Sequence, residues 1–115
     1  MKTVDVVIIG GGPAGLAAAI ELHKKGVRDI LILEREKKLG GILRQCIHDG
    51  FGLTRFGESL SGPEYASRFV RKVEELSIPY RTDTTVVKLT PDKQVFASSK
   101  DGYISVQAKA VILAM

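Results

Sequence analysis

The sequence has one cysteine, no tryptophan and no apolar run long enough to cross a bilayer. A single cysteine, Cys46, excludes an internal disulfide and favours a reducing compartment, so we expect a cytoplasmic protein. The uncharged run from Val6 to Ile20 has 15 residues, fewer than the roughly 20 that a spanning helix needs, and glycines and a proline interrupt it. We therefore expect no membrane association and no export signal.

Charge of one sign is not concentrated anywhere in the chain. The sequence has 17 Lys and Arg against 13 Asp and Glu, a formal net charge of +4, and the basic residues are spread out instead of forming a nucleic-acid-binding block. We expect no nucleic-acid partner and interpret the charge as mild support for an anionic small ligand. With 115 residues, 44% of them hydrophobic, the chain is one globular domain or part of one.

The first 34 residues predict a βαβ unit. Residues 3–9 are rich in Val and Ile, as buried parallel strands are, and a helix is expected over 13–25 with a proline in its first turn and Gly26 as a left-handed cap. Residues 29–33, "DILIL", form a second buried strand that ends at Glu34. Because such crossovers are right-handed, the two strands should be parallel neighbours.

The middle of the chain is a long connection followed by an amphipathic helix. Residues 35–60 show no periodicity but contain five glycines, and a connection of this length in a small domain usually has a function. A helix is predicted from Ser61, with Glu64 completing a capping box. Its apolar positions are spaced by three and four residues: Tyr65, Phe69, Val73 and Leu76.

After Pro79 the apolar period changes to two. Three short strands are expected over 84–90, 94–99 and 103–108, joined by turns that include an Asp-Gly pair, and they predict an antiparallel meander. Residues 110–115, "AVILAM", predict a further buried strand. Because the chain stops inside this apolar strand, we expect residues 1–115 to be part of a larger protein.

The strongest motif is G-x-G-x-x-G, formed by Gly10, Gly12 and Gly15 between the first strand and the first helix. The first glycine permits a tight turn, the second lets the backbone approach a pyrophosphate, and the third lets helix and strand pack closely. The helix start carries no Ser, Thr, Asp or Asn cap, so its free N–H groups are expected to bind phosphate oxygens.

Glu34 ends the next strand 19 positions after Gly15, where a dinucleotide-binding fold places an acid for the ribose hydroxyls. A carboxylate there repels a 2′-phosphate, so the motif favours FAD or NAD over NADP and leaves the first two open. The predicted fold is α/β, Rossmann-like, with a parallel sheet flanked by helices and a small three-stranded antiparallel meander.

Three segments resemble the FAD-dependent pyridine nucleotide-disulfide oxidoreductase superfamily, the flavoproteins with two dinucleotide-binding domains: "DVVIIGGGPAGLAAAIEL", "LEREKKLGG" and the meander leading to "AVILAM". The resemblance covers essentially the whole chain as the amino-terminal part of the FAD domain. It implies that the glycine fingerprint binds FAD and that the glycine pair lies against the flavin-bearing half. The strand with Thr84, Val86 and Leu89 is expected at the adenine. The expected cofactor-binding residues are Gly10, Gly12, Pro13, Ala14, Gly15, Glu34, Arg35, Gly40, Gly41, Ile42, Val86 and Ala114.

The same resemblance implies a flavin-dependent NAD(P)H oxidoreductase in full length. It would transfer hydride between a nicotinamide cofactor, held by a domain that these 115 residues do not include, and an unknown small-molecule substrate or acceptor. Residues 1–115 alone are expected to be inactive and to hold FAD weakly or not at all. The segment "GGILRQCIHDGFGLTRFGESLSGPEYA" is similar to a branch linked to glycerol-3-phosphate or amino-acid dehydrogenase systems, and a homo-oligomer or a dehydrogenase partner subunit is a possible assembly.

Two other functions remain open, and the catalytic residues stay unassigned. The rivals are an NAD-binding dehydrogenase segment and a non-catalytic dinucleotide-binding module. Disulfide-reducing relatives carry Cys-x4-Cys beside the flavin, but here Phe51 follows Cys46 at that spacing, which excludes a dithiol cycle. His48 has no carboxylate partner at a meaningful spacing, and no metal-ligand spacing appears.

Overall fold

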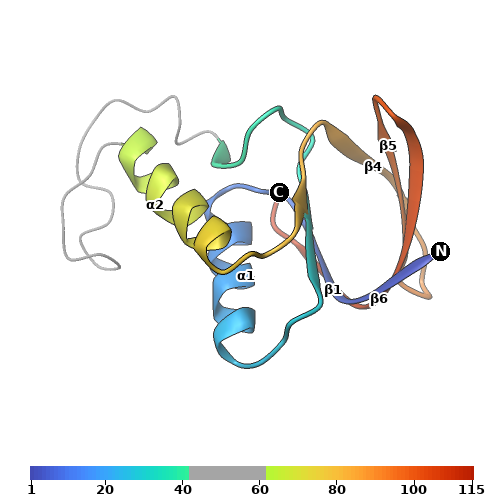
Figure 1. The fold of residues 1–115 in the computed structure, drawn as a ribbon. Helices are drawn as coiled ribbons and strands as arrows, with labels where there is room; N and C mark the ends of the chain where they lie inside the picture. The colour runs from blue at the N-terminus through green and yellow to red at the C-terminus, as the bar shows by residue number, and fades with distance from the viewer. Residues whose placement is uncertain (42–61) are drawn as a thin grey trace.

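The computed structural model describes residues 1–41 and 62–115. Figure 1 shows two helices beside one twisted, six-stranded sheet. The elements in chain order are β1 (Lys2–Ile9), α1 (Pro13–Lys24), β2 (Ile30–Leu33), α2 (Gly62–Glu75), β3 (Tyr80–Arg81), β4 (Thr84–Leu89), β5 (Gln94–Ser99) and β6 (Gly102–Leu113). Their order across the sheet is β3-β2-β1-β6-β5-β4.

The βαβ unit predicted from the sequence is confirmed. β1 pairs in parallel with β2, with Val6 opposite Ile30 and Ile9 opposite Leu33, and α1 makes the crossover between them. The bounds of all three elements agree with the predicted ones to within one residue. β2 is buried at all four positions, as expected for a parallel strand that is covered on both faces.

The meander is also confirmed, but its last strand differs from the prediction. The sequence predicted separate strands over 103–108 and 110–115, whereas the structure has one continuous strand, β6, from Gly102 to Leu113. Its first half pairs antiparallel with β5, and from Val106 onward it pairs in parallel with β1. No residue near Lys109 favours a turn, so the chain stays extended and one strand joins the parallel and antiparallel parts of the sheet. The expected burial of its end is wrong for Leu113, which is 59% exposed.

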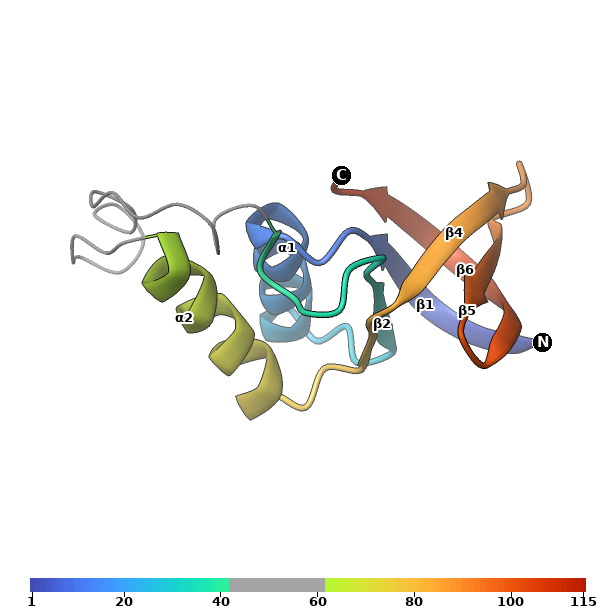
Figure 2. The same ribbon diagram turned by 90° about the horizontal axis from the view of Figure 1, so that it is seen from above.

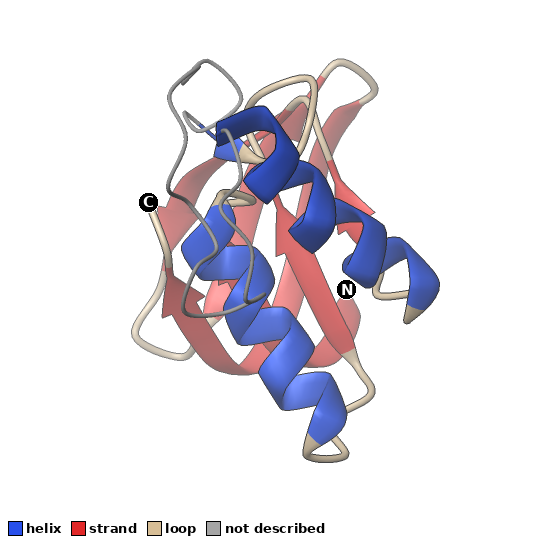
Figure 3. Cartoon of the chain, turned by 90° about the vertical axis from the view of Figure 1, so that its left-hand side faces the viewer, coloured by secondary structure: helices blue, strands red, loops and turns tan. Residues whose placement is uncertain are grey.

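The sheet is covered differently on its two faces. Figures 2 and 3 show α1 and α2 together on one face, while β4, β5 and the first half of β6 fold over the other. The alternation of β1 divides its last four side chains accordingly: Val6 and Ile8 pack with the helices, and Val7 and Ile9 pack with the meander. Two hydrophobic cores result, one on each side of β1 and β2.

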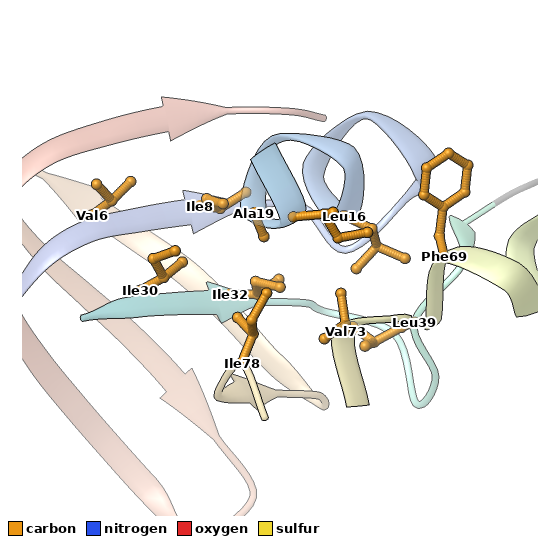
Figure 4. Close-up of a cluster of buried hydrophobic side chains, with 11 residues drawn as sticks. Val6, Ile8, Leu16, Ala19, Ile30, Ile32, Leu39, Phe69, Val73 and Ile78 are labelled. Carbon is orange, nitrogen blue, oxygen red and sulfur yellow. The ribbon is translucent and has the colours of Figure 1, made fainter. Parts of the chain in front are cut away.

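The helix-side core contains the amphipathic face of α2. The apolar positions read from the sequence lie there: Phe69 and Val73 are buried, and Tyr65 packs edge-on against Phe69 with ring centroids 5.0 Å apart. Figure 4 shows Phe69 and Val73 with side chains of α1 and β2. The predicted helix is therefore confirmed over Gly62–Glu75, while Ser61 of the expected capping box lies outside the described residues.

One short strand was missed. Residues Tyr80 and Arg81 form β3, which pairs in parallel with Ile32 and Leu33 of β2. Two residues are too few to show the alternation of apolar and polar residues that indicates a strand, so this element is defined only by its pairing with β2. In the part of the chain that the structure describes, neither helix has the length and apolar character needed to span a membrane.

Candidate functional site

The glycine turn lies at the carboxyl ends of the parallel strands, at a point where the strand order reverses. The connection from β1 leads through α1 to β2 on one side, while β6 lies on the other side of β1. In open α/β sheets, ligands bind in the crevice that forms at such a switch point. The turn from Gly10 to Gly12 occupies this position, beside the end of β6.

Two of the fingerprint glycines are required by the protein's own packing. Gly10 has φ of +118°, and a Cβ there would lie 2.4 Å from the carbonyl oxygen of Ala114. A Cβ on Gly15 would lie 1.9 Å from the carbonyl oxygen of Gly10. The first glycine therefore allows the turn to pass the end of β6, and the third lets α1 approach β1.

The amino-terminal end of α1 has no side-chain cap. Gly12 is the N-cap residue in an extended conformation (φ −80°, ψ −175°), Pro13 occupies the first turn, and no acidic residue lies in that turn. The N–H of Leu16 donates to the carbonyl oxygen of Gly12 at 3.0 Å and closes the first helical turn. The preceding N–H groups of a helix have no acceptor within it, and with the positive end of the helix dipole they favour an anion. Ala14 is exposed at this end.

The predicted glycine pair packs directly on the turn. The N–H of Gly40 donates to the carbonyl oxygen of Gly11 at 2.7 Å. Gly41 has φ of +63°, and a Cβ on it would lie 3.1 Å from the Cα of Gly12. Among the described residues, a Cβ on Gly12 would meet only the Cα of Gly41, at 3.8 Å, which is an ordinary contact. Residues 1–41 and 62–115 therefore leave room for a side chain on Gly12, unlike on Gly10 and Gly15.

Glu34 is buried, with 7% of its surface exposed, and its carboxylate binds backbone. Oε1 accepts the N–H of Gly11 at 2.8 Å, and Oε2 accepts the N–H of Glu36 at 2.7 Å. The sequence predicted the acid for ribose hydroxyls but not these two bonds. Each carboxylate oxygen has a second lone pair, so the group can still accept from a diol.

Gly11 is the residue that reading the fingerprint missed. It occupies one of the variable positions of the motif, yet its N–H and its carbonyl oxygen are both bound by the segment that follows β2. A Cβ on Gly11 would lie 2.6 Å from Cδ2 of Leu39 and 3.1 Å from the Cβ of Glu34. The sequence signal for this close approach is the middle glycine of "GGG", which the fingerprint itself does not require.

Of the remaining predicted residues, one adjoins the turn, and the others lie farther from it or outside the described part of the chain. Arg35 points to solvent, its side chain 77% exposed, with Nε 3.8 Å from Oε1 of Glu36. Val86 is half-buried against the meander-side core, near Glu34 in the fold because the N–H of Thr84 donates to the carbonyl oxygen of Glu34 at 2.9 Å. Ala114 adjoins the turn, and its N–H donates to the carbonyl oxygen of Ile9 at 2.8 Å. Three other residues considered from the sequence lie outside the described residues: Ile42, Cys46 and His48.

Comparison with known proteins gives one family match over nearly the whole chain. A family model described as pyridine nucleotide-disulphide oxidoreductase matches residues 4–115. A ferredoxin–NADP reductase of Leuconostoc citreum is 32% identical over 113 residues, which are 96% of this chain and 32% of the reductase. The hydrogen cyanide synthase subunit HcnB of Pseudomonas protegens is 50% identical over 56 residues, 48% of this chain and 12% of that subunit.

Solved structures show the same architecture. An L-proline dehydrogenase from P. horikoshii superposes with a TM-score of 0.79 and 28% sequence identity, covering 98% of this chain and 22% of the dehydrogenase. The bacillithiol disulfide reductase of Staphylococcus aureus, at 19% identity and a TM-score of 0.77, shares the fold. The chain spans about a third of the length of the ferredoxin–NADP reductase and less of HcnB.

Proposed function

The chain belongs to the pyridine nucleotide-disulphide oxidoreductase family, and from that membership we propose that residues 1–115 form the amino-terminal part of an FAD-binding domain in a flavin-dependent oxidoreductase. The extent of this part is supported by the relatives, of which the chain covers a third or less. When bound, FAD supplies the acceptance and donation of hydride. The chain's own residues bind and orient it.

The observation that carries the proposal is the uncapped amino-terminal end of α1 at the switch point. A dinucleotide diphosphate provides the oxygens that its first-turn N–H groups need, and no side-chain oxygen competes for them. The backbones of Gly12 and Gly41 meet without any Cβ between them, so the glycine pair packs directly on the main chain at the start of α1. The residues present therefore fit a dinucleotide.

The other residues take roles along the length of the cofactor. In this proposal the diphosphate binds the turn made of Gly10, Gly12, Pro13, Ala14 and Gly15. Glu34 accepts from the ribose, with Arg35 and Val86 on the adenine side. The flavin-bearing half then lies along the segment of Gly40, Gly41 and Ile42 and beside Ala114.

The full-length reaction in this proposal is hydride transfer between NAD(P)H and a small-molecule substrate or acceptor. A nicotinamide step is supported by the relative named as a ferredoxin–NADP reductase, and an assembly with other subunits by the relative named as a synthase subunit. A cytoplasmic location is supported by the single cysteine. Residues 1–115 alone are expected to turn over no substrate.

Titration of the cofactor-free full-length protein with FAD, FMN and NAD tests the cofactor. Loss of flavin fluorescence reports binding of the first two, and displacement of FAD reports binding of the third. We expect FAD to bind and FMN, which lacks the AMP half and so has neither the diphosphate nor the adenosine ribose, to fail, because the proposed contacts are to those two groups. NAD binding at least as tight as that of FAD would favour the rival function, an NAD-binding dehydrogenase segment. Binding of none of the three would contradict the proposal.

A further inference from the structure

Both backbone polar groups of Gly11 are bound by one segment of chain. Its N–H donates to Oε1 of Glu34 at 2.8 Å, and its carbonyl oxygen accepts from the N–H of Gly40 at 2.7 Å. Gly11 stands directly before Gly12, the N-cap of α1. The N–H belongs to the peptide between Gly10 and Gly11, and the carbonyl oxygen belongs to the peptide between Gly11 and Gly12, which also carries the N–H of Gly12. The orientation of these two peptides therefore sets the direction in which the N–H groups at the start of α1 point.

Glu34 connects this peptide to the start of the segment that ends in the glycine pair. Its second oxygen, Oε2, accepts the N–H of Glu36 at 2.7 Å, so one carboxylate joins the glycine turn to the chain that leaves β2. The group is 93% buried, and a buried carboxylate is stable only when its oxygens accept hydrogen bonds. Bonds from N–H groups to an ionised oxygen are the stronger kind.

We propose that Glu34 is a positioning residue that holds the glycine turn in its diphosphate-binding geometry before the dinucleotide arrives. This role rests on the proposed function and is separate from any contact with the ribose. Without the carboxylate, the Gly11 N–H loses its acceptor in a buried position, and the peptide rotates to find another. The N–H groups of the turn then no longer converge on the phosphates.

Electrostatics makes the two roles of Glu34 separable. Removing a negative charge beside an anion site strengthens anion binding if geometry is unchanged. Loss of the ribose contact weakens only those ligands that carry the diol. A weaker affinity for a diphosphate ligand that has no diol is therefore the signature of positioning. Loss of the negative charge would strengthen the binding of that ligand, and loss of the ribose contact would leave it unchanged.

The experiment compares ADP with 2′,3′-dideoxy-ADP, each displacing FAD from wild type, Glu34→Ala, Glu34→Gln and Glu36→Ala. Glu36→Ala is the matched control, since it removes a neighbouring exposed carboxylate and keeps the backbone N–H. We expect Glu34→Ala to lose about tenfold in affinity for the dideoxy ligand, the scale of one charged hydrogen bond. Glu34→Gln should lose less, because its amide oxygen replaces one acceptor. Glu36→Ala should match wild type or bind slightly tighter.

Three results would overturn the assignment. If Glu34→Ala binds dideoxy-ADP as tightly as wild type, or tighter, while ADP weakens, Glu34 serves the ribose alone and the proposed function stands. Should Glu34→Ala fail to fold, Glu34→Gln decides in the same way. Failure of wild type to bind FAD would remove the proposed function and this role together. In ¹⁵N-labelled protein without ligand, the amide protons of Gly11 and Gly40 should exchange faster in the folded Glu34 variants, and unchanged exchange would also contradict the role.

Discussion

The two ends of α1 are finished in opposite ways. At the carboxyl end, the N–H of Gly26 donates to the carbonyl oxygen of His23, and the N–H of Val27 donates to that of Leu22, which is a Schellman motif. Gly26 is left-handed with φ of +97°, and His23 and Lys24 complement the negative end of the dipole. At the amino end, Gly12 contributes no side chain and no acid lies in the first turn.

This difference separates a helix end with a structural role from the end that is proposed to bind the diphosphate. At the carboxyl end, carbonyl oxygens of the last turn accept N–H groups of the chain that follows, so Gly26 is needed only for its left-handed backbone conformation. The amino end instead brings backbone segments together, and its N–H groups remain available to a ligand. Substitutions at the two ends should therefore affect stability and affinity in different proportions.

Gly15→Ala should have the largest effect. The added Cβ would lie 1.9 Å from the carbonyl oxygen of Gly10, a backbone atom that cannot move without separating α1 from β1. We expect a loss of about 3 kcal/mol in the free energy of unfolding, with FAD binding lost as the turn opens. Urea denaturation followed by circular dichroism measures the free energy of unfolding, and flavin fluorescence measures FAD binding. A loss below 1 kcal/mol would contradict the close packing.

Gly12→Ser should separate stability from affinity. The extended N-cap conformation suits serine, and a Cβ there makes only an ordinary contact with Gly41. The hydroxyl can then cap α1, raising the free energy of unfolding by about 0.5 kcal/mol, while it occupies N–H groups that a diphosphate needs. We expect FAD affinity to fall about tenfold, equivalent to about 1.4 kcal/mol. A variant that is more stable and binds FAD as before would show that the helix end does not hold the phosphates.

The sequence predicted elements better than it predicted the connections between them. β1, α1 and β2 followed from runs of β-branched residues and from end signals such as Gly26, because these depend on neighbours in the chain. The Glu34 carboxylate accepts two backbone N–H groups, and the Gly11 carbonyl oxygen accepts the N–H of Gly40. These bonds depend on how the segment after β2 lies against the glycine turn. No pattern of neighbouring residues predicts this contact between two segments. The continuity of β6 was missed because "AKA" alone does not distinguish a strand from a break.

Gly26→Ala should cost less than the change at Gly15 and leave binding intact. A Cβ on Gly26 meets no atom within 4 Å, so the cost comes only from placing alanine at φ of +97°, about 1 kcal/mol. Gly26→Asn is the matched variant, because asparagine tolerates the left-handed region better and should lose about half as much. FAD affinity should be equal in both variants and wild type. An affinity change here would show that the two ends of α1 are coupled.

Lys24→Gln should have the smallest effect. The ammonium lies in the last turn of α1, 3.8 Å from Oε1 of Glu21, and both side chains are about half exposed, so water and salt screen the pair. What remains is its favourable interaction with the negative end of the helix dipole, and its removal should lower the free energy of unfolding by about 0.3 kcal/mol at low salt. The difference should vanish in 1 M NaCl, where a loss caused by packing would persist. Thermal unfolding at the two salt concentrations measures this difference in stability. FAD affinity should be unchanged by the substitution at both concentrations, because the whole length of α1 separates Lys24 from the amino end where the phosphates are proposed to bind.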